Sequence, residues 1–293
     1  MAPVDHRGAL FALVSALLFG GSTPLSKALL SDFHPVFLAG ILYLSSGIGL
    51  LAVQAARRYL AAASSPSEPL GLTGSLWLAG ATLSGGVVAP ILLMSGLTLT
   101  SGSTASLLLN LEGVLTALLA WLAFRETFDR QLALGMASIV CGAMVLSWQG
   151  QPTWTVPLGP ALVAAACFAW AVDNNLTRKI AFGDPMNISI AKGLVAGSSN
   201  LCLAIYIGAS GANLNAIAAA SLVGFINYGI SNVLFVLALR QLGAARTAAY
   251  YSTAPFFGAL IAIILLGEGV TTTFAITAVL MGFGVFQLTK RVR

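Results

Sequence analysis

The stretch that decides the fold runs from residue 103 to residue 126 and reads STASLLLNLEGVLTALLAWLAFRE. It is an apolar run of membrane-spanning length, and it carries one acid, Glu112, near its middle before the closing pair Arg125 and Glu126. At about 1.5 Å per residue, Glu112 lies roughly 14 Å from the start of such a helix, close to the midplane of a hydrocarbon layer about 30 Å thick. We therefore predict one long transmembrane helix with an acid at mid-depth.

The same pattern recurs in the second half of the chain, where residues 245–268 read ARTAAYYSTAPFFGALIAIILLGE. When Glu126 is aligned with Glu268, Asn110 matches Ser252, and small residues recur at spacings of three and four, which is one helix face. The chain is therefore predicted to be a duplicated membrane protein.

The composition excludes a sizeable water-soluble domain. Charged residues make up 8% of the chain, against about 25% in soluble domains, and 58% of the residues are hydrophobic. The mean hydropathy is +0.92 over the whole length. The net charge of +5 comes from basic residues spread singly and in pairs between apolar runs, which suits loops facing anionic lipid and not nucleic acid.

Ten apolar segments are long enough to span a bilayer, which predicts an all-α polytopic membrane protein. They cover approximately residues 8–29, 35–55, 73–97, 103–123, 131–148, 156–176, 186–207, 217–239, 245–266 and 271–288.

The placement of Lys and Arg predicts the orientation. With the N-terminus inside, twelve basic residues fall on the cytoplasmic side and only Lys27 falls outside, while Lys192 lies within a span. Both termini are thus expected in the cytoplasm, with the chain in the inner (plasma) membrane. The cytoplasmic residues are Arg7, Arg57, Arg58, Arg125, Arg130, Arg178, Lys179, Arg240, Arg246, Lys290, Arg291 and Arg293.

Five spans per half is an odd number, so two repeats, residues 1–150 and 151–293, should lie in opposite orientations. Residues 8–27, GALFALVSALLFGGSTPLSK, also match residues 159–178, GPALVAAACFAWAVDNNLTR. Inverted repeats are typical of secondary transporters, which bind substrate near the midplane at the repeat interface.

The segment Asn110-Leu111-Glu112-Gly113 looks like a family motif, Leu-Glu-Pro, with glycine in place of proline, whereas Ala254-Pro255 keeps the proline and lacks the acid. On these motifs and their order, the chain resembles the drug/metabolite transporter superfamily, in particular its ten-span EamA-type members. Its general likeness is to bacterial exporters of aromatic amino acids. The resemblance implies a ten-helix inverted-repeat bundle around a central cavity, and efflux of amino acids and similar metabolites by alternating access.

The aligned first spans of the halves offer cavity candidates, because Phe19 matches Trp170 and Ser22 matches Asp173. A large aromatic beside a hydrogen-bonding group suits an amphipathic solute. Alternatively, the hydroxyls bond backbone carbonyls and the rings fill gaps between helices.

Glu112 must be protonated, paired or open to a water-filled cavity at this depth. It could bind a substrate ammonium, exchange protons, or act as a structural carboxyl bonded to a neighbouring helix. The small residues on the other face of its helix are expected to be a packing surface: Ser103, Ser106, Asn110, Gly113 and Ala117.

Asp173 and Lys192 lie at similar depths on consecutive spans and are predicted to form an intramembrane ion pair, although the lysine could also snorkel to the interface. Mid-span or aligned positions add Ser84, Tyr228 and Tyr250. The predicted substrate-binding set is therefore Phe19, Ser22, Ser84, Glu112, Trp170, Asp173, Tyr228 and Tyr250.

Other function classes find no support in the sequence. It has no phosphate-binding loop, only two histidines and no metal-ligand spacing, so we expect neither an ATP-driven pump nor an enzyme, and no catalytic residue, cofactor or metal. The expected partners are a small-molecule substrate, the bilayer and, as a candidate co-substrate, protons, with the chain acting as a monomer. Export of other amphipathic metabolites or organic cations, or a channel, is the alternative.

The predicted topology is testable by accessibility. Single cysteines placed in the 57–72 loop and at the C-terminus should react with a membrane-impermeant maleimide only after the cytoplasmic side is exposed. Labelling of either position from outside intact cells would contradict the N-inside arrangement.

Overall fold

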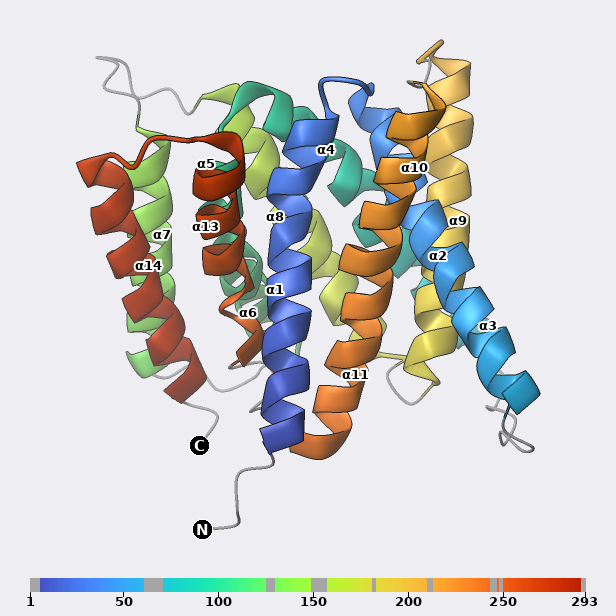
Figure 1. The fold of residues 1–293 in the computed structure, drawn as a ribbon. Helices are drawn as coiled ribbons and strands as arrows, with labels where there is room; N and C mark the ends of the chain where they lie inside the picture. The colour runs from blue at the N-terminus through green and yellow to red at the C-terminus, as the bar shows by residue number, and fades with distance from the viewer. Residues whose placement is uncertain are drawn as a thin grey trace.

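The computed structural model describes residues 6–60, 71–124, 130–148, 157–180, 183–209, 213–242, 247 and 250–290, and its regular elements in this part are helices (Figure 1). The first half contains α1 (His6–Leu29), α2 (Pro35–Leu60), α3 (Leu72–Ala81), the π-helical segment η1 (Thr82–Val88), α4 (Ala89–Leu99), α5 (Gly102–Leu108), α6 (Asn110–Phe124) and α7 (Arg130–Ser147). The second half contains α8 (Leu158–Arg178), α9 (Pro185–Tyr206), α10 (Leu214–Val223), the π-helical segment η2 (Gly224–Ile230), α11 (Ser231–Leu242), α13 (Ala254–Leu266) and α14 (Thr272–Lys290).

Seven helical stretches in the described part are long and apolar enough to cross a membrane, and two shorter apolar helices follow at the C-terminal end. The prediction of an all-helical, multi-pass membrane protein is confirmed in this form, while the count of ten spans stays a prediction. Helix α8 is not among the seven, and its last turns carry Asp173, Asn174 and Asn175. The acidic closing residue Glu126, its neighbour Arg125 and most of the 57–72 loop lie outside the described residues.

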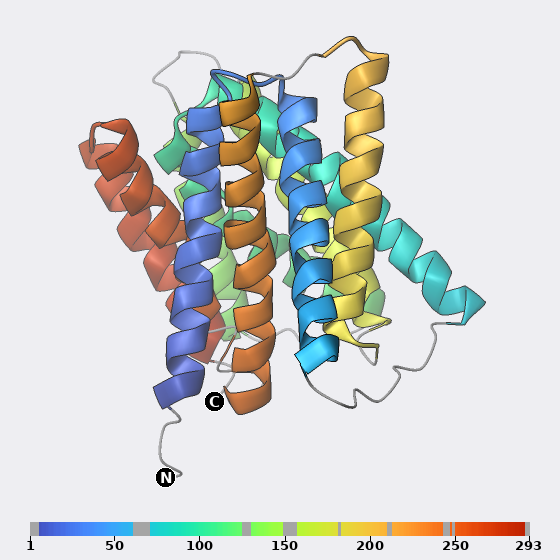
Figure 2. The ribbon, with the colours of Figure 1, turned by 45° about the vertical axis from the view of Figure 1, so that its right-hand side comes forward.

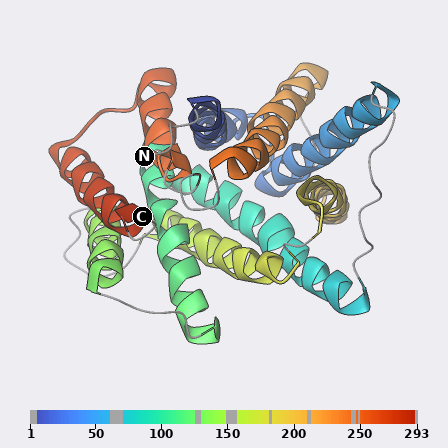
Figure 3. The same ribbon diagram turned by 90° about the horizontal axis from the view of Figure 1, so that it is seen from below.

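The principal helix contacts join the two halves of the chain. Helix α2 packs on α9, α7 on α14, α1 on α11 and α13, and α8 on α4 and α6. Seen from below, α7 and α14 lie at one side of the bundle and α2, α3 and α9 at the other, with α1, α8 and α11 between them (Figure 3). The interior is thus built where the two halves meet, and α1 begins at the same end of the bundle at which α14 ends (Figure 1).

Glycines allow close contact between α2 and α9. A side-chain Cβ at Gly197 would lie 2.3 Å from the backbone nitrogen of Leu44, and one at Gly193 would lie 2.8 Å from the Cα of Gly47. Without a strong hydrophobic force between helices in lipid, such close backbone approach supplies the packing energy.

The helix predicted over residues 103–126 spans Gly102–Ala123 in the structure, but it has an irregularity at one residue that the sequence analysis did not predict. It breaks at Leu109 between α5 and α6, and the matching stretch of the second half leaves the helix at residues 252–253 before α13. At the first break the Asn110 side-chain amide donates to the Leu107 carbonyl (2.9 Å), and the Glu112 amide donates to the Leu109 carbonyl (3.0 Å). A local side-chain bond of this kind competes with regular helix bonding.

The helices before α4 and α11 also depart from regular α geometry, each through a seven-residue π-helical segment, η1 and η2. Figure 2 shows α3, η1 and α4 crossing the bundle obliquely behind α2. A π-helical turn leaves backbone groups without their usual partners, and such turns are frequent at functional sites.

Glu268 joins the two broken spans at one end of the bundle. It follows Gly267, which has a left-handed backbone (φ 65°) that ends α13, and its carboxylate accepts from the amides of Gly102 (2.6 Å) and Ser103 (2.7 Å) at the start of α5. A carboxylate at a helix N-terminus satisfies unpaired donors and opposes the helix dipole.

Replacing this cap should destabilise the bundle. We expect Glu268→Ala to lower the free energy of unfolding by about 1–2 kcal/mol, because two backbone donors lose a charged acceptor. Glu268→Gln should cost less, since one acceptor oxygen remains. Thermal unfolding of the detergent-solubilised protein measures both, with the exposed Asp32→Asn as control; a wild-type melting temperature for Glu268→Ala would contradict the role.

Candidate functional site

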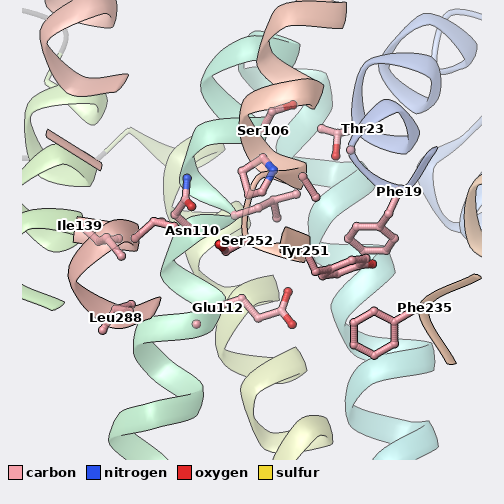
Figure 4. Close-up of a pocket in the computed structure, with 16 residues that line it drawn as sticks. Phe19, Thr23, Ser106, Asn110, Glu112, Ile139, Phe235, Tyr251, Ser252 and Leu288 are labelled. Carbon is pink, nitrogen blue, oxygen red and sulfur yellow. The ribbon is translucent and has the colours of Figure 1, made fainter. Parts of the chain in front are cut away.

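A cavity of about 240 Å³ lies beside the breaks in the two discontinuous spans (Figure 4). Its walls come from α1, from both sides of the Leu109 break, and from α7, α11, α13 and α14. Three aromatic residues, a few neutral polar residues and Glu112 line it among aliphatic side chains. The aromatic and polar residues are Phe19, Thr23, Ser106, Asn110, Phe235, Tyr251 and Ser252.

Glu112 is the one charged side chain among the described residues that line the cavity. Its carboxylate is directed toward the side on which Tyr251 and Phe235 lie (Figure 4). One oxygen, Oε1, accepts from Nδ2 of Asn174 on α8 (2.9 Å), which also donates to the Thr116 hydroxyl (3.2 Å). A carboxylate offers about four acceptor positions, so the carboxylate can bind further donors in the cavity.

Five aromatic rings form a continuous row that begins at the cavity. Phe235 and Tyr251 have centroids 4.7 Å apart, and Tyr251 and Phe19 are 5.5 Å apart. The row continues from Phe19 to Tyr228 (6.0 Å) and from Tyr228 to Tyr43 (5.5 Å). These separations are typical of favourable aromatic pairs, so the rings form one packed wall.

At the far end of the row, side chains satisfy the carbonyls of the π-helical segment η1. The Gly85 carbonyl accepts from the Tyr43 hydroxyl (3.0 Å) and from Nε1 of Trp170 (2.9 Å), and the Gly86 carbonyl accepts from Nδ2 of Asn200 (3.1 Å). The Ser84 hydroxyl donates to the Ala169 carbonyl (2.6 Å). These bonds supply the partners that irregular backbone needs inside a membrane.

An ion pair lies against the same segment. The Lys192 ammonium is 2.6 Å from Oδ1 and 2.7 Å from Oδ2 of Asp173, and the Thr177 hydroxyl donates to Oδ1 (2.8 Å). The two charged side chains are 19% and 8% exposed, so the structure brings them together inside the bundle. Gly85 makes room for the carboxylate, because a Cβ there would lie 1.9 Å from Oδ2.

The structure places two of the eight predicted site residues, Phe19 and Glu112, in the cavity wall. The other six are not among the lining residues. Ser84, Trp170 and Asp173 belong to the cluster around η1, and Tyr228 lies in the aromatic row between the two. The remaining two are Ser22, which is buried on α1, and Tyr250.

Tyr251 lines the cavity in place of the predicted Tyr250. One residue is about 100° around a helix, so the two neighbouring rings leave the helix in different directions. Ser106, Asn110 and Gly113, predicted to form a packing surface, also line the cavity. The break at Leu109 lies within this surface and interrupts its regular helix face.

Asn174 is the partner of Glu112 that the sequence reasoning missed. The sequence could have indicated this residue, because Asp173, Asn174 and Asn175 are three consecutive polar residues on a largely apolar span. Two of them donate hydrogen bonds to the first half of the chain: Asn174 to Glu112 and Thr116, and Asn175 to the Thr116 carbonyl (3.2 Å). Within the described ranges, no group of three or more His, Cys, Asp or Glu residues could hold a metal ion.

A comparison with protein families finds the same family twice along the chain. Residues 6–148 and residues 157–289 each match the EamA-like transporter family. The chain therefore belongs to this family. It consists of two EamA repeats, and the family is one of transporters, which agrees with the membrane-spanning helices.

A relative described as an uncharacterized transporter of Methanothermobacter thermautotrophicus is 30% identical, over 96% of this chain and 85% of the relative. A solved crystal structure of a 17% identical protein has a TM-score of 0.69, and the match covers 98% of this chain and 97% of that one. At that identity the likeness shows the fold alone. The EamA assignment leaves the likeness to aromatic amino-acid exporters as a prediction.

The Asp173–Lys192 pair of this EamA protein should behave as a coupled unit. Asp173→Asn or Lys192→Met alone leaves an uncompensated charge at depth, and removing one partner of a buried pair costs about 3–5 kcal/mol. The double variant removes both charges and should recover much of that loss. Unfolding of the four proteins in detergent gives the coupling energy; additive losses would show that the two charges act independently.

Proposed function

We propose that this protein is a secondary transporter that exports amino acids, bulky apolar ones above all, and similar metabolites by alternating access. The observation that carries the proposal is the cavity beside the breaks of the two discontinuous spans, with one acid and an aromatic wall. In secondary transporters, discontinuous helices form the substrate site near the midplane. The ammonium of an amino acid would bind Glu112, and its side chain would pack on Phe19, Tyr251 and Phe235.

The proposed architecture is ten spans arranged as two inverted repeats. The helix contacts support it, because they occur as corresponding pairs: α1 packs on α11 and α13 as α8 packs on α4 and α6. Elements at matching places in the two halves also share their irregularities, namely the two π-helical segments and the two breaks. When two repeats are related in this way, one bundle of helices can move as a rigid body against the other around a fixed substrate site.

The proposed orientation places both termini in the cytoplasm of the cell whose inner (plasma) membrane holds the protein. Basic residues of the described part, such as Arg57, Arg58 and Arg178, occur at helix ends, in accord with the positive-inside rule. Arg125, Arg246, Arg291 and Arg293 belong to the same prediction but lie outside the described residues.

Transport assays in reconstituted liposomes test the function. We expect saturable uptake and counterflow of bulky apolar amino acids, and no transport of sugars, because the cavity wall is largely apolar. Trans-stimulation by unlabelled solute separates a transporter from a channel, and single-channel currents in planar bilayers would favour the channel. Sugar transport without amino-acid transport would refute the proposed solute class.

Glu112→Gln tests whether the acid acts as a charge during the cycle. Glutamine matches a protonated carboxyl in shape and can still accept from Asn174, so the melting temperature should hold. Transport should fall, together with any stimulation by a pH gradient, because an amide neither binds ammonium strongly nor releases a proton. Asp32→Asn serves as the control, and full transport by Glu112→Gln at every pH would reduce Glu112 to a structural hydrogen-bonding group.

A further inference from the structure

Among the described residues, the cavity wall carries a negative charge and no positive charge. Glu112 supplies a negative charge, and none of the described lining residues is Lys, Arg or His. Two lysines of the helices have other partners: Lys192 binds both Asp173 oxygens, and the Lys27 ammonium donates to the Leu97 carbonyl in α4. Among the described residues, the cavity wall thus offers a counter-charge to an ammonium group and none to a carboxylate.

The aromatic wall adds to the preference of the cavity for an ammonium over a carboxylate. Tyr251 is in ring contact with both Phe19 and Phe235, and Figure 4 shows the Glu112 carboxylate directed toward the side on which these rings lie. Aromatic faces attract cations through their quadrupole and repel anions. A carboxylate together with an aromatic wall is therefore a site for an organic ammonium ion.

The neutral polar residues of the cavity wall do not supply a positive charge that could bind a solute carboxylate. Thr23, Ser106 and Ser252 can donate hydrogen bonds, but they carry no charge, and the Asn110 amide already donates to the Leu107 carbonyl. The cavity, at about 240 Å³, keeps a compact solute near Glu112. A carboxylate on a bound solute would share this cavity with Glu112, and like charges inside a protein repel each other.

We infer that the site recognises its solute by the ammonium end alone, so that amines and carboxyl-masked amino-acid derivatives such as amides bind more tightly than the parent amino acids. This inference rests on the proposed function, since it concerns the same cavity. It narrows the solute class to compact organic cations with an apolar body. A solute with a free α-carboxylate still binds, but with lower affinity.

Four probes that share one phenyl ring separate the charges. Phenethylamine and phenylalaninamide present an ammonium without a carboxylate, phenylalanine presents both charges, and 3-phenylpropionate presents only a carboxylate. Binding is measured by isothermal titration calorimetry on the purified full-length protein in nanodiscs. We expect the two cations to bind at least about tenfold more tightly than phenylalanine, and phenylpropionate to bind most weakly, because unpaired like charges cost more than the 1.4 kcal/mol that equals a tenfold difference.

Variants of Glu112 show whether this residue determines the order of the four binding affinities. Glu112→Gln should remove the advantage of the cations, Glu112→Asp should keep part of it, and Asp32→Asn should keep all of it. Equal or tighter binding of phenylalanine than of phenylalaninamide overturns the inference, as does absence of binding by every probe. A cation preference that survives Glu112→Gln overturns it as well.

The same probes in proteoliposome counterflow keep the inference distinct from the proposed function. Cation-selective binding without counterflow of any probe supports the inference and contradicts transport. Counterflow in which phenylalanine matches or exceeds the two cations supports transport and contradicts the inference.

Discussion

A backbone carbonyl inside a hydrocarbon layer must find a donor, and this constraint organises the centre of the protein. The π-helical segment η1 presents the Gly85 and Gly86 carbonyls to neighbouring helices, and Tyr43, Trp170 and Asn200 bond them. Each donor comes from a different helix, α2, α8 and α9. The irregular segment is therefore a junction at which three helices are held in register.

The same junction holds the intramembrane charges. Asp173 fits against Gly85 because that residue has no side chain, and Lys192 then neutralises the carboxylate. An isolated charge at this depth would be costly, so the pair and the π-helical turn stabilise each other's positions. Asn174, the next residue on α8, bonds Glu112, so the cavity acid and the ion pair are positioned by adjacent residues of one helix.

The aromatic row connects these two polar regions through packing. Tyr43 bonds the Gly85 carbonyl at one end, and Tyr251 and Phe235 line the cavity at the other. Packed rings move together more readily than separately, because a gap in a dense interior loses contact energy.

The sequence by itself determined the membrane class, the duplication and the presence of an acid at mid-depth in a span, because hydropathy, repeat spacing and residue type are local properties of the chain. It also named Asp173 and Lys192 as candidates for one ion pair. Only the tertiary structure decided that the helix breaks at Leu109, that Tyr251 and not Tyr250 faces the cavity, and that Asn174 bonds Glu112. Carbonyls freed at a break inside a membrane need donors that local sequence cannot fully predict: here Asn110 bonds the Leu107 carbonyl, and Cys167 of the other half bonds the Leu108 carbonyl.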